Sequence, residues 1–150
     1  MTNRITVRKA GLRDAGMLGP LFDAYRTFYR QKPDLRGAKR FLSQRLARKE
    51  SVVFVARKGG AAVGFMQLYP TFSSVSMRRL WILNDLYVVP EGRRRGVAEA
   101  LIARARRLAK ETSAEGLFLE TAVGNKAARR LYEKLGWKRE REFYRYNCDL

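Results

Sequence analysis

Two carboxylates, Asp85 and Glu120, stand in apolar stretches of this chain, where an ionised side chain is costly. The stretch around the first, residues 80–89, is apolar apart from Asn84 and Asp85. Asp85 is therefore either a group that binds or deprotonates an ammonium ion, or a structural carboxylate bonded to backbone or to an arginine. Glu120 occupies a comparable place in a later stretch and has the same two interpretations. Because the chain has no histidine, proton transfer falls to Asp, Glu, Tyr, Lys, Cys or water.

A basic turn shortly after Asp85 is a candidate anion site. Its six residues are Arg93, Arg94, Arg95, Gly96, Val97 and Ala98. A helix that begins here directs unpaired N–H groups and partial positive charge outward, which suits an anion such as a pyrophosphate. The small residues Gly96 and Ala98 would let a ligand approach the backbone closely. The same six residues also fit a solvated basic turn without a ligand.

A strand, a turn and a helix must position these groups. Residues 80–89 are rich in branched and aromatic side chains, which predicts a strand buried on both faces. Residues 90–92, Pro-Glu-Gly, predict a turn. From Val97 onward apolar residues recur at helical spacing, so we expect a helix with one face against a sheet. Those residues are Val97, Leu101, Ile102, Ala105, Leu108 and Ala109.

The order of strand, [Arg/Gln]-x-x-Gly-x-[Gly/Ala] and amphipathic helix resembles the acetyl-CoA-binding core of the GNAT superfamily of N-acetyltransferases. Arg93, Gly96 and Ala98 are the matching residues. A second block, residues 117–137, resembles the next strand and helix of that superfamily. It contains Asn125-x-x-Ala128-x-x-x-Tyr132 and closes on Gly136-Trp137. The run from Leu83 to Tyr87 is most similar to the histone and polyamine acetyltransferase branch, although related polyamine enzymes carry Glu where this chain has Asn84.

The resemblance implies an α/β (α+β) fold with a mixed, mainly antiparallel sheet and helices on both faces. It also implies direct transfer of acetyl from acetyl-CoA, without a metal, to a primary amine of a small molecule, a polyamine or a protein lysine. Tyr132 would be the general acid, and Asn125 and Ala128 would contact acetyl-CoA. The base stays open between Asp85, Glu120 and water. In the same fold the pantetheine arm would pair with the backbone of Leu86, Tyr87, Val88 and Val89, and the turn from Arg93 to Ala98 would hold the pyrophosphate.

Other patterns complete the expected architecture. Alternating or apolar runs predict strands at residues 5–10, 52–57, 62–69, 116–121 and 143–148. Helical spacing predicts helices capped by Asp14 and Asp34, and another over residues 126–135. Membership of the resembled branch implies a homodimer, which the edge of the last strand would serve.

Composition bounds the class of protein. With 150 residues and 46% hydrophobic content, we expect a single N-acetyltransferase domain over residues 1–150. No apolar run reaches the length of a membrane span, and the polar start does not resemble a signal peptide, so we expect a cytoplasmic protein without membrane contact. The single cysteine, Cys148, excludes an intrachain disulfide.

A net charge of +18 predicts attraction to polyanions. It leaves two alternatives to catalysis, a basic nucleic-acid-binding module and a non-catalytic acyl-CoA sensor of the same fold. Charge also disfavours a polycationic acceptor at long range. A polyamine would need a local acidic pocket built from Asp34, Asp85, Glu120 or Glu142.

Overall fold

The computed structural model describes residues 4–150, and its contacts divide them into two compact units. The first unit extends to Leu119, and the second is Glu120–Leu150. Each unit is described by itself below. Within residues 4–150, no helix is long and apolar enough to cross a membrane.

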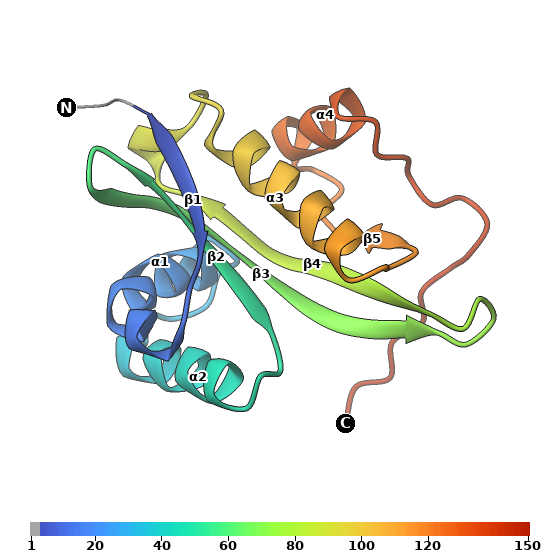
Figure 1. Ribbon diagram of the computed structural model, residues 1–150, viewed down its shortest axis with the longest axis horizontal. Coiled ribbons are helices and arrows are strands. Elements are labelled where there is room, and N and C mark those ends of the chain that lie inside the picture. Colours follow the sequence, from blue (N-terminus) through green and yellow to red (C-terminus); the bar gives the residue numbers. More distant parts are fainter. Residues whose placement is uncertain (1–3) are drawn as a thin grey trace. The chain divides into compact units, whose positions relative to one another are not determined.

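One five-stranded sheet organises the first unit (Figure 1). Its strands are β1 (Ile5–Lys9), β2 (Val52–Lys58), β3 (Ala61–Ser73), β4 (Arg78–Val88) and β5 (Gly116–Phe118). They lie in the order β1-β2-β3-β4-β5, and only the β4–β5 pair is parallel. The mixed, mainly antiparallel sheet predicted from the sequence is therefore confirmed.

Helices cover both faces of this sheet, as predicted. Helices α1 (Ala15–Phe28) and α2 (Leu35–Ala47) lie on one face, and α3 (Val97–Glu111) lies on the other (Figure 1). Short 3₁₀ turns, η1 (Leu12–Asp14) and η2 (Pro90–Gly92), precede α1 and α3. All six apolar residues that defined the predicted face of α3 are buried, which follows from the packing of an amphipathic helix on a sheet.

The two predicted helix caps differ. The Asp34 carboxylate accepts a hydrogen bond from the Gly37 N–H at 2.9 Å and caps α2 as expected. Asp14 precedes α1 but makes no side-chain cap there. Its carboxylate instead accepts from the Gly11 N–H and from the Arg8 guanidinium, which lowers the pKa of Asp14 from 3.8 to about 2. The aspartate thus stabilises η1 rather than the helix.

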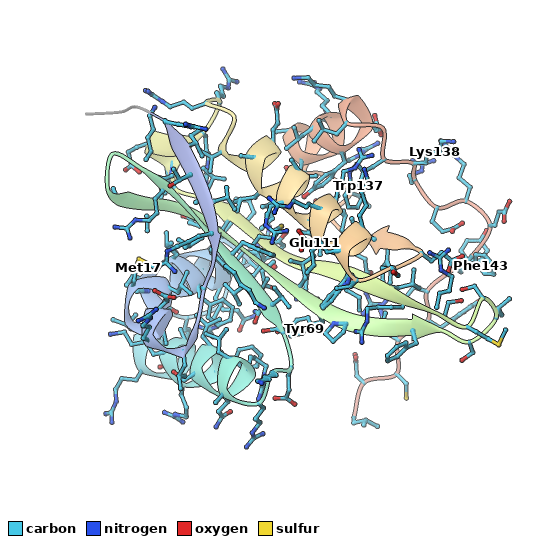
Figure 2. All side chains as sticks on the ribbon, viewed as in Figure 1. Met17, Tyr69, Glu111, Trp137, Lys138 and Phe143 are labelled. Atoms are coloured by element: carbon cyan, nitrogen blue, oxygen red, sulfur yellow. The ribbon has the colours of Figure 1, made fainter. Side chains whose placement is uncertain are left out.

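In the second unit, α4 spans Lys126–Lys134 and matches the predicted helix. The strand predicted over residues 143–148 is wrong, because residues 137–150 contain neither helix nor strand (Figure 2). Phe143 and Tyr144 are 76% and 90% exposed. Alternation of aromatic and polar residues forms a strand only where a neighbouring strand supplies hydrogen-bond partners, and none of the five described strands pairs with this segment. The edge proposed for subunit pairing is therefore also absent.

Candidate active site

Strand β4 has two halves with different neighbours. Residues 80–82 pair with β3 on one side and with residues 116–118 of β5 on the other. Residues 85–88 pair with β3, and among the described residues no strand pairs with residues 84–88 on the β5 side. We call residues 78–83 the closed half and residues 84–88 the open half. The open half contains Asp85, Leu86, Tyr87 and Val88 and presents backbone groups that an extended ligand can bond.

A β-bulge at Asn84 separates the two halves. Gln67 of β3 pairs with Asp85 while the next residue, Leu68, pairs with Leu83, so Asn84 is the extra residue of β4. Adjacent residues of β3 point to opposite faces, so the bulge turns Asp85 to the face opposite Leu83. Gln67 shares its face with Phe65, whose ring packs against Tyr25 of α1 at 5.9 Å. The bulge therefore directs Asp85 toward the α1 face.

Asp85 is 3% exposed and surrounded by hydrogen-bond donors rather than cations. Gln67 Nε2 donates to Oδ2 at 2.5 Å, and Asn84 Nδ2 donates to Oδ1 at 2.7 Å. Burial raises the pKa of Asp85, and the hydrogen bonds from Gln67, Asn84 and Tyr25 oppose that rise. The sequence predicted that residues 80–89 form a strand buried on both faces. That prediction fails at the bulge, where Asn84 is exposed. A buried carboxylate whose pKa is raised by its surroundings is a candidate for proton exchange with a substrate.

The network continues through residues that the sequence analysis did not select. Ser51 Oγ donates to Gln67 Oε1 at 2.7 Å, and both residues are buried, Gln67 completely. The available signal was Gln67 itself, a polar residue inside the apolar run of β3. A buried polar side chain in such a run requires a partner, but the sequence does not identify which one.

The basic turn has the backbone geometry of an anion site. Arg94 and Gly96 both have positive φ, 60° and 81°, and Gly96 precedes the first residue of α3. The first intrahelical bond runs from the Ala100 N–H to the Gly96 carbonyl, which leaves the N–H groups of Val97 and Ala98 without partners inside the helix. Nothing lies within 4 Å of the position of a Cβ at Gly96. These features fit a pyrophosphate, and we find no conflict between the turn and such a group.

Close packing ties this turn to the open half of β4. A Cβ at Gly64 of β3 would lie 2.9 Å from the Tyr87 carbonyl oxygen and 3.1 Å from Val97 Cγ1. The Val89 N–H donates to the Val63 carbonyl at 2.9 Å, and Arg93 Nε donates to the Val88 carbonyl at 3.0 Å. Because a missing side chain lets three elements approach, the end of β4 and the start of α3 are held together.

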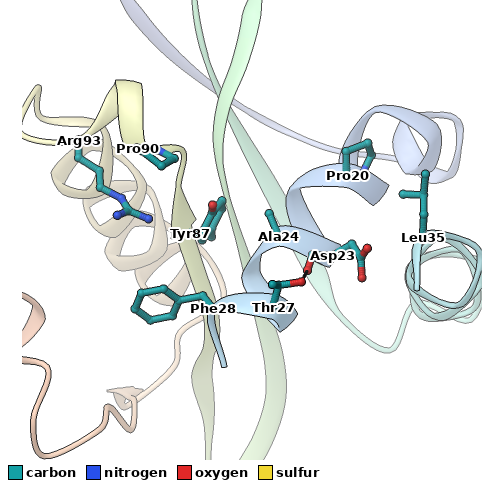
Figure 3. Close-up of a pocket in the computed structure, with 9 residues that line it drawn as sticks. All are labelled: Pro20, Asp23, Ala24, Thr27, Phe28, Leu35, Tyr87, Pro90 and Arg93. Carbon is teal, nitrogen blue, oxygen red and sulfur yellow. Dashed lines mark hydrogen bonds between the residues drawn. The ribbon is translucent and has the colours of Figure 1, made fainter. Parts of the chain in front are cut away.

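A cavity of about 640 Å³ opens on the α1 side of this region (Figure 3). It is lined by Pro20, Asp23, Ala24, Thr27, Phe28, Leu35, Tyr87, Pro90 and Arg93. The only carboxylate in this lining, Asp23, already accepts from Arg26 at 2.9 Å and from the Asp34 N–H at 3.0 Å. The cavity is thus mostly apolar, with a cationic group on one wall and a compensated carboxylate on another.

The remaining predicted site residues lie in the second unit. Asn125 caps α4, since its side-chain oxygen accepts from the Ala128 N–H at 3.2 Å. Tyr132 lies two turns along the same helix, with its ring 5.8 Å from that of Trp137. Glu120 is 62% exposed and paired with Arg145, so it does not share the buried environment of Asp85. The structure groups Asp85 with the basic turn in one unit, and Asn125 with Ala128 and Tyr132 in the other.

A splayed mixed sheet, with a bulged strand leading into a basic turn and a helix, is the framework of acyl-CoA N-acyltransferases. Comparison with known proteins identifies the family. The model of the GNAT acetyltransferase family matches residues 19–137. The chain is 46% identical to YhfO, an uncharacterized N-acetyltransferase of Bacillus subtilis, over 95% of both chains. This protein belongs to the GNAT family of N-acetyltransferases.

Other relatives agree with this assignment. An N-alpha-acetyltransferase of Sulfurisphaera tokodaii is 29% identical over 73% of this chain and 70% of its own length. The crystal structure of a probable acetyltransferase is 40% identical and superposes with a TM-score of 0.92 over 97% of both chains. Family membership implies acetyl-CoA as the cosubstrate. The interpretation of the chain as a basic nucleic-acid-binding module without catalysis has no support in these matches.

Proposed function

We propose that this N-acetyltransferase transfers acetyl from acetyl-CoA directly to a primary amine at the open half of β4. The observation that carries the proposal is the open half itself: the bulge at Asn84 turns Asp85 to the α1 face, and no strand among the described residues pairs with residues 84–88 on the β5 side. The backbone of Leu86, Tyr87, Val88 and Val89 would pair with the pantetheine arm as an added strand.

The anion-binding turn would fix the other end of the cosubstrate. Its N–H groups at Val97 and Ala98 and the positive end of α3 would hold the pyrophosphate. Arg94 and Arg95, both exposed, would add charge around it, while Arg93 is held by the Val88 carbonyl. Asn125 and Ala128 at the start of α4 would complete the contacts with acetyl-CoA. This role requires both units to work as one N-acetyltransferase domain, which the family match across residues 19–137 favours.

Two side chains would move protons. The bound thioester supplies the acetyl group, and the acceptor amine must lose a proton before or during its attack. Asp85 would take that proton through a water molecule, because its 3% exposure leaves no direct path for a bulky amine. Tyr132 would donate a proton to the departing thiolate, since the ordinary pKa values of tyrosine and thiol, about 10 and about 8.5, lie close together.

The first unit favours an acceptor with a single amine over a polyamine. Most carboxylates near the cavity are already engaged: Asp23 binds Arg26, Asp34 caps α2, and Asp85 is buried. With a net charge of +18 around them, they form no acidic pocket for a second ammonium. The cavity beside Tyr87 instead offers an apolar wall for the body of an amine. Small amines, protein lysines and, from the name of the Sulfurisphaera relative, N-terminal α-amines are the acceptors to compare.

The proposal is tested by measuring thiol release from acetyl-CoA with four amine acceptors. These are kanamycin, spermidine, L-lysine and a peptide with an N-terminal alanine. We expect amine-dependent release with at least one acceptor. Tyr132→Phe should lower kcat about 100-fold while leaving the Kd for acetyl-CoA unchanged, because only the acidic proton is removed. Unchanged kcat would exclude Tyr132 as the acid. Tight binding of acetyl-CoA without release for any amine would contradict the transferase and indicate a sensor.

A further inference from the structure

Ser51, Gln67 and Asp85 form a buried hydrogen-bond network. This network contains more polar groups than are needed to solvate the Asp85 carboxylate alone. Gln67 is completely buried on β3, and Ser51 lies just before β2. The network therefore extends from the start of β2, across β3, to the bulge of β4. None of the roles proposed above uses Ser51 or Gln67. A fully buried amide between two apolar strands requires partners at both ends, and here it has one at each end.

The direction of each hydrogen bond follows from the chemistry of the groups. An ionised carboxylate only accepts, so both amides beside Asp85 must present their NH₂ groups to it. The Gln67 carbonyl oxygen then faces away from Asp85, where Ser51 Oγ donates to it at 2.7 Å. Asn84 donates from its side-chain NH₂ group to Asp85, so its side-chain oxygen faces away from Asp85, at the exposed bulge. One proton arrangement therefore satisfies all four side chains.

We propose that Ser51 and Gln67 are positioning residues for acetyl transfer, which hold the Asp85 carboxylate in the orientation and ionisation state in which it accepts the amine's proton. This inference rests on the proposed role of Asp85. Ser51 fixes which end of the Gln67 amide faces Asp85. Gln67 then supplies the 2.5 Å hydrogen bond that favours the charged form against burial.

Other groups near Asp85 do not replace this hydrogen bond. Tyr25 approaches from α1, and its hydroxyl donates to the backbone carbonyl of Asn84 at 3.1 Å. It also lowers the pKa of Asp85, but less than Gln67 does. Tyr69 lies two residues after Gln67 on β3 and so shares its face. Burial, together with the charge of Asp85, raises the pKa of Tyr69 to about 12, so it stays protonated. Arg45 and Glu50 act on Tyr69 with opposite signs. No cation in the described residues bonds directly to Asp85, so the amide from Gln67 has a large share in stabilising the charge.

The test is an NMR titration of the Asp85 carboxyl carbon in the wild-type protein, Ser51→Ala and Gln67→Leu. The spectrum of Asp85→Asn assigns the signal. We expect Gln67→Leu to move the titration midpoint up by about one pH unit, because a hydrogen bond to a charged group is lost. Ser51→Ala should move it in the same direction by a few tenths of a unit. If Gln67→Leu does not fold, Ser51→Ala decides, because it removes only one hydroxyl.

A kinetic readout separates positioning from ordinary stability. The acid limb of the kcat/KM profile, measured with whichever of the four acceptors above reacts fastest, should follow the NMR midpoint in each variant. Unchanged midpoints and acid limbs in both variants would overturn the inference, even if activity fell uniformly. An acid limb that also survives in Asp85→Asn would remove the proposed base itself, which is a different failure. Ser43→Ala, on α2 outside the network, is a matched control and should leave both readouts unchanged.

Discussion

The closed and open halves of β4 are adjacent in sequence but differ in strand pairing and in the side chains that they bury. In the closed half, Trp81 and Leu83 are buried, and strands β3 and β5 flank residues 80–82. In the open half, no strand among the described residues pairs on the β5 side, and a buried carboxylate replaces an apolar side chain. We therefore propose that the same strand is a structural element at one end and binds the cosubstrate at the other. The bulge at Asn84 makes the change possible within one residue.

The comparison predicts opposite effects of substitution in the two halves, beginning with Asp85. Asp85→Asn should lower kcat/KM by about 1,000-fold, since it removes the proposed base without changing side-chain size. Its free energy of unfolding at pH 8 should be equal to or above that of the wild-type protein, because a buried charge is lost. Reduced stability with full activity would reverse the assignment of the open half. Thiol-release kinetics and urea unfolding measure both quantities.

The pH dependence of stability sharpens the same prediction. Burial raises the pKa of Asp85 above the ordinary 3.8, so folding favours its protonated form. That contribution to stability is complete below pH 3.8 and is lost as pH rises through the raised pKa. The stability of the wild-type protein relative to Asp85→Asn should therefore fall as pH rises through this window. A difference that is constant with pH would contradict the raised pKa.

Leu83 tests the closed half. Its side chain is 3% exposed, so Leu83→Ala should lower the free energy of unfolding by about 3 kcal/mol through lost burial and a residual cavity. The Kd for acetyl-CoA should change less than about threefold, since Leu83 points away from the face of Asp85. Urea unfolding and calorimetric titration make the comparison. A large loss of cofactor affinity in a folded variant would show that the two halves are not separable.

Gly96 tests the turn that follows the open half. With φ at 81°, Gly96→Val forces a branched residue into the left-handed region and narrows the approach to the backbone. We expect the Kd for acetyl-CoA to rise about tenfold. Gly59→Val is the matched control, because Gly59 also has positive φ, 57°, in the β2–β3 turn. The Gly59→Val variant should be less stable than the wild-type protein but bind acetyl-CoA with the same Kd. A wild-type Kd for acetyl-CoA in Gly96→Val would contradict the pyrophosphate site.

Trp81 is expected to show the smallest effect. Its Nε1 donates to Thr112 Oγ1 at 2.8 Å, and Trp81→Phe removes this hydrogen bond while keeping most of the apolar contact. The free energy of unfolding should fall by about 1 kcal/mol, with kcat/KM unchanged. A change in kcat/KM larger than the change in stability would give the closed half a catalytic influence that the account denies. Thermal unfolding and thiol release suffice to measure it.

Local patterns predicted the elements that local forces determine. Helix α3, the basic turn before it and the Asp34 cap all follow from spacing and from chemistry within a few residues. The bulge at Asn84 was not predictable, because it depends on the register of β4 against β3. The Ser51–Gln67 contact spans 16 residues and depends on the same register. The strand wrongly predicted at residues 143–148 illustrates the same limit. Its alternating pattern is visible in the local sequence, but whether a neighbouring strand pairs with it depends on distant parts of the chain.

Backbone hydrogen exchange across β4 tests the central claim most directly. The claim is that the open half of β4 holds acetyl-CoA, while the closed half already has its partners. Saturating acetyl-CoA should slow exchange in residues 84–98 and leave residues 78–83 unchanged, because only the former gain hydrogen-bond partners. Bound acetyl-CoA without protection in residues 84–98 would contradict the account, as would protection confined to the closed half.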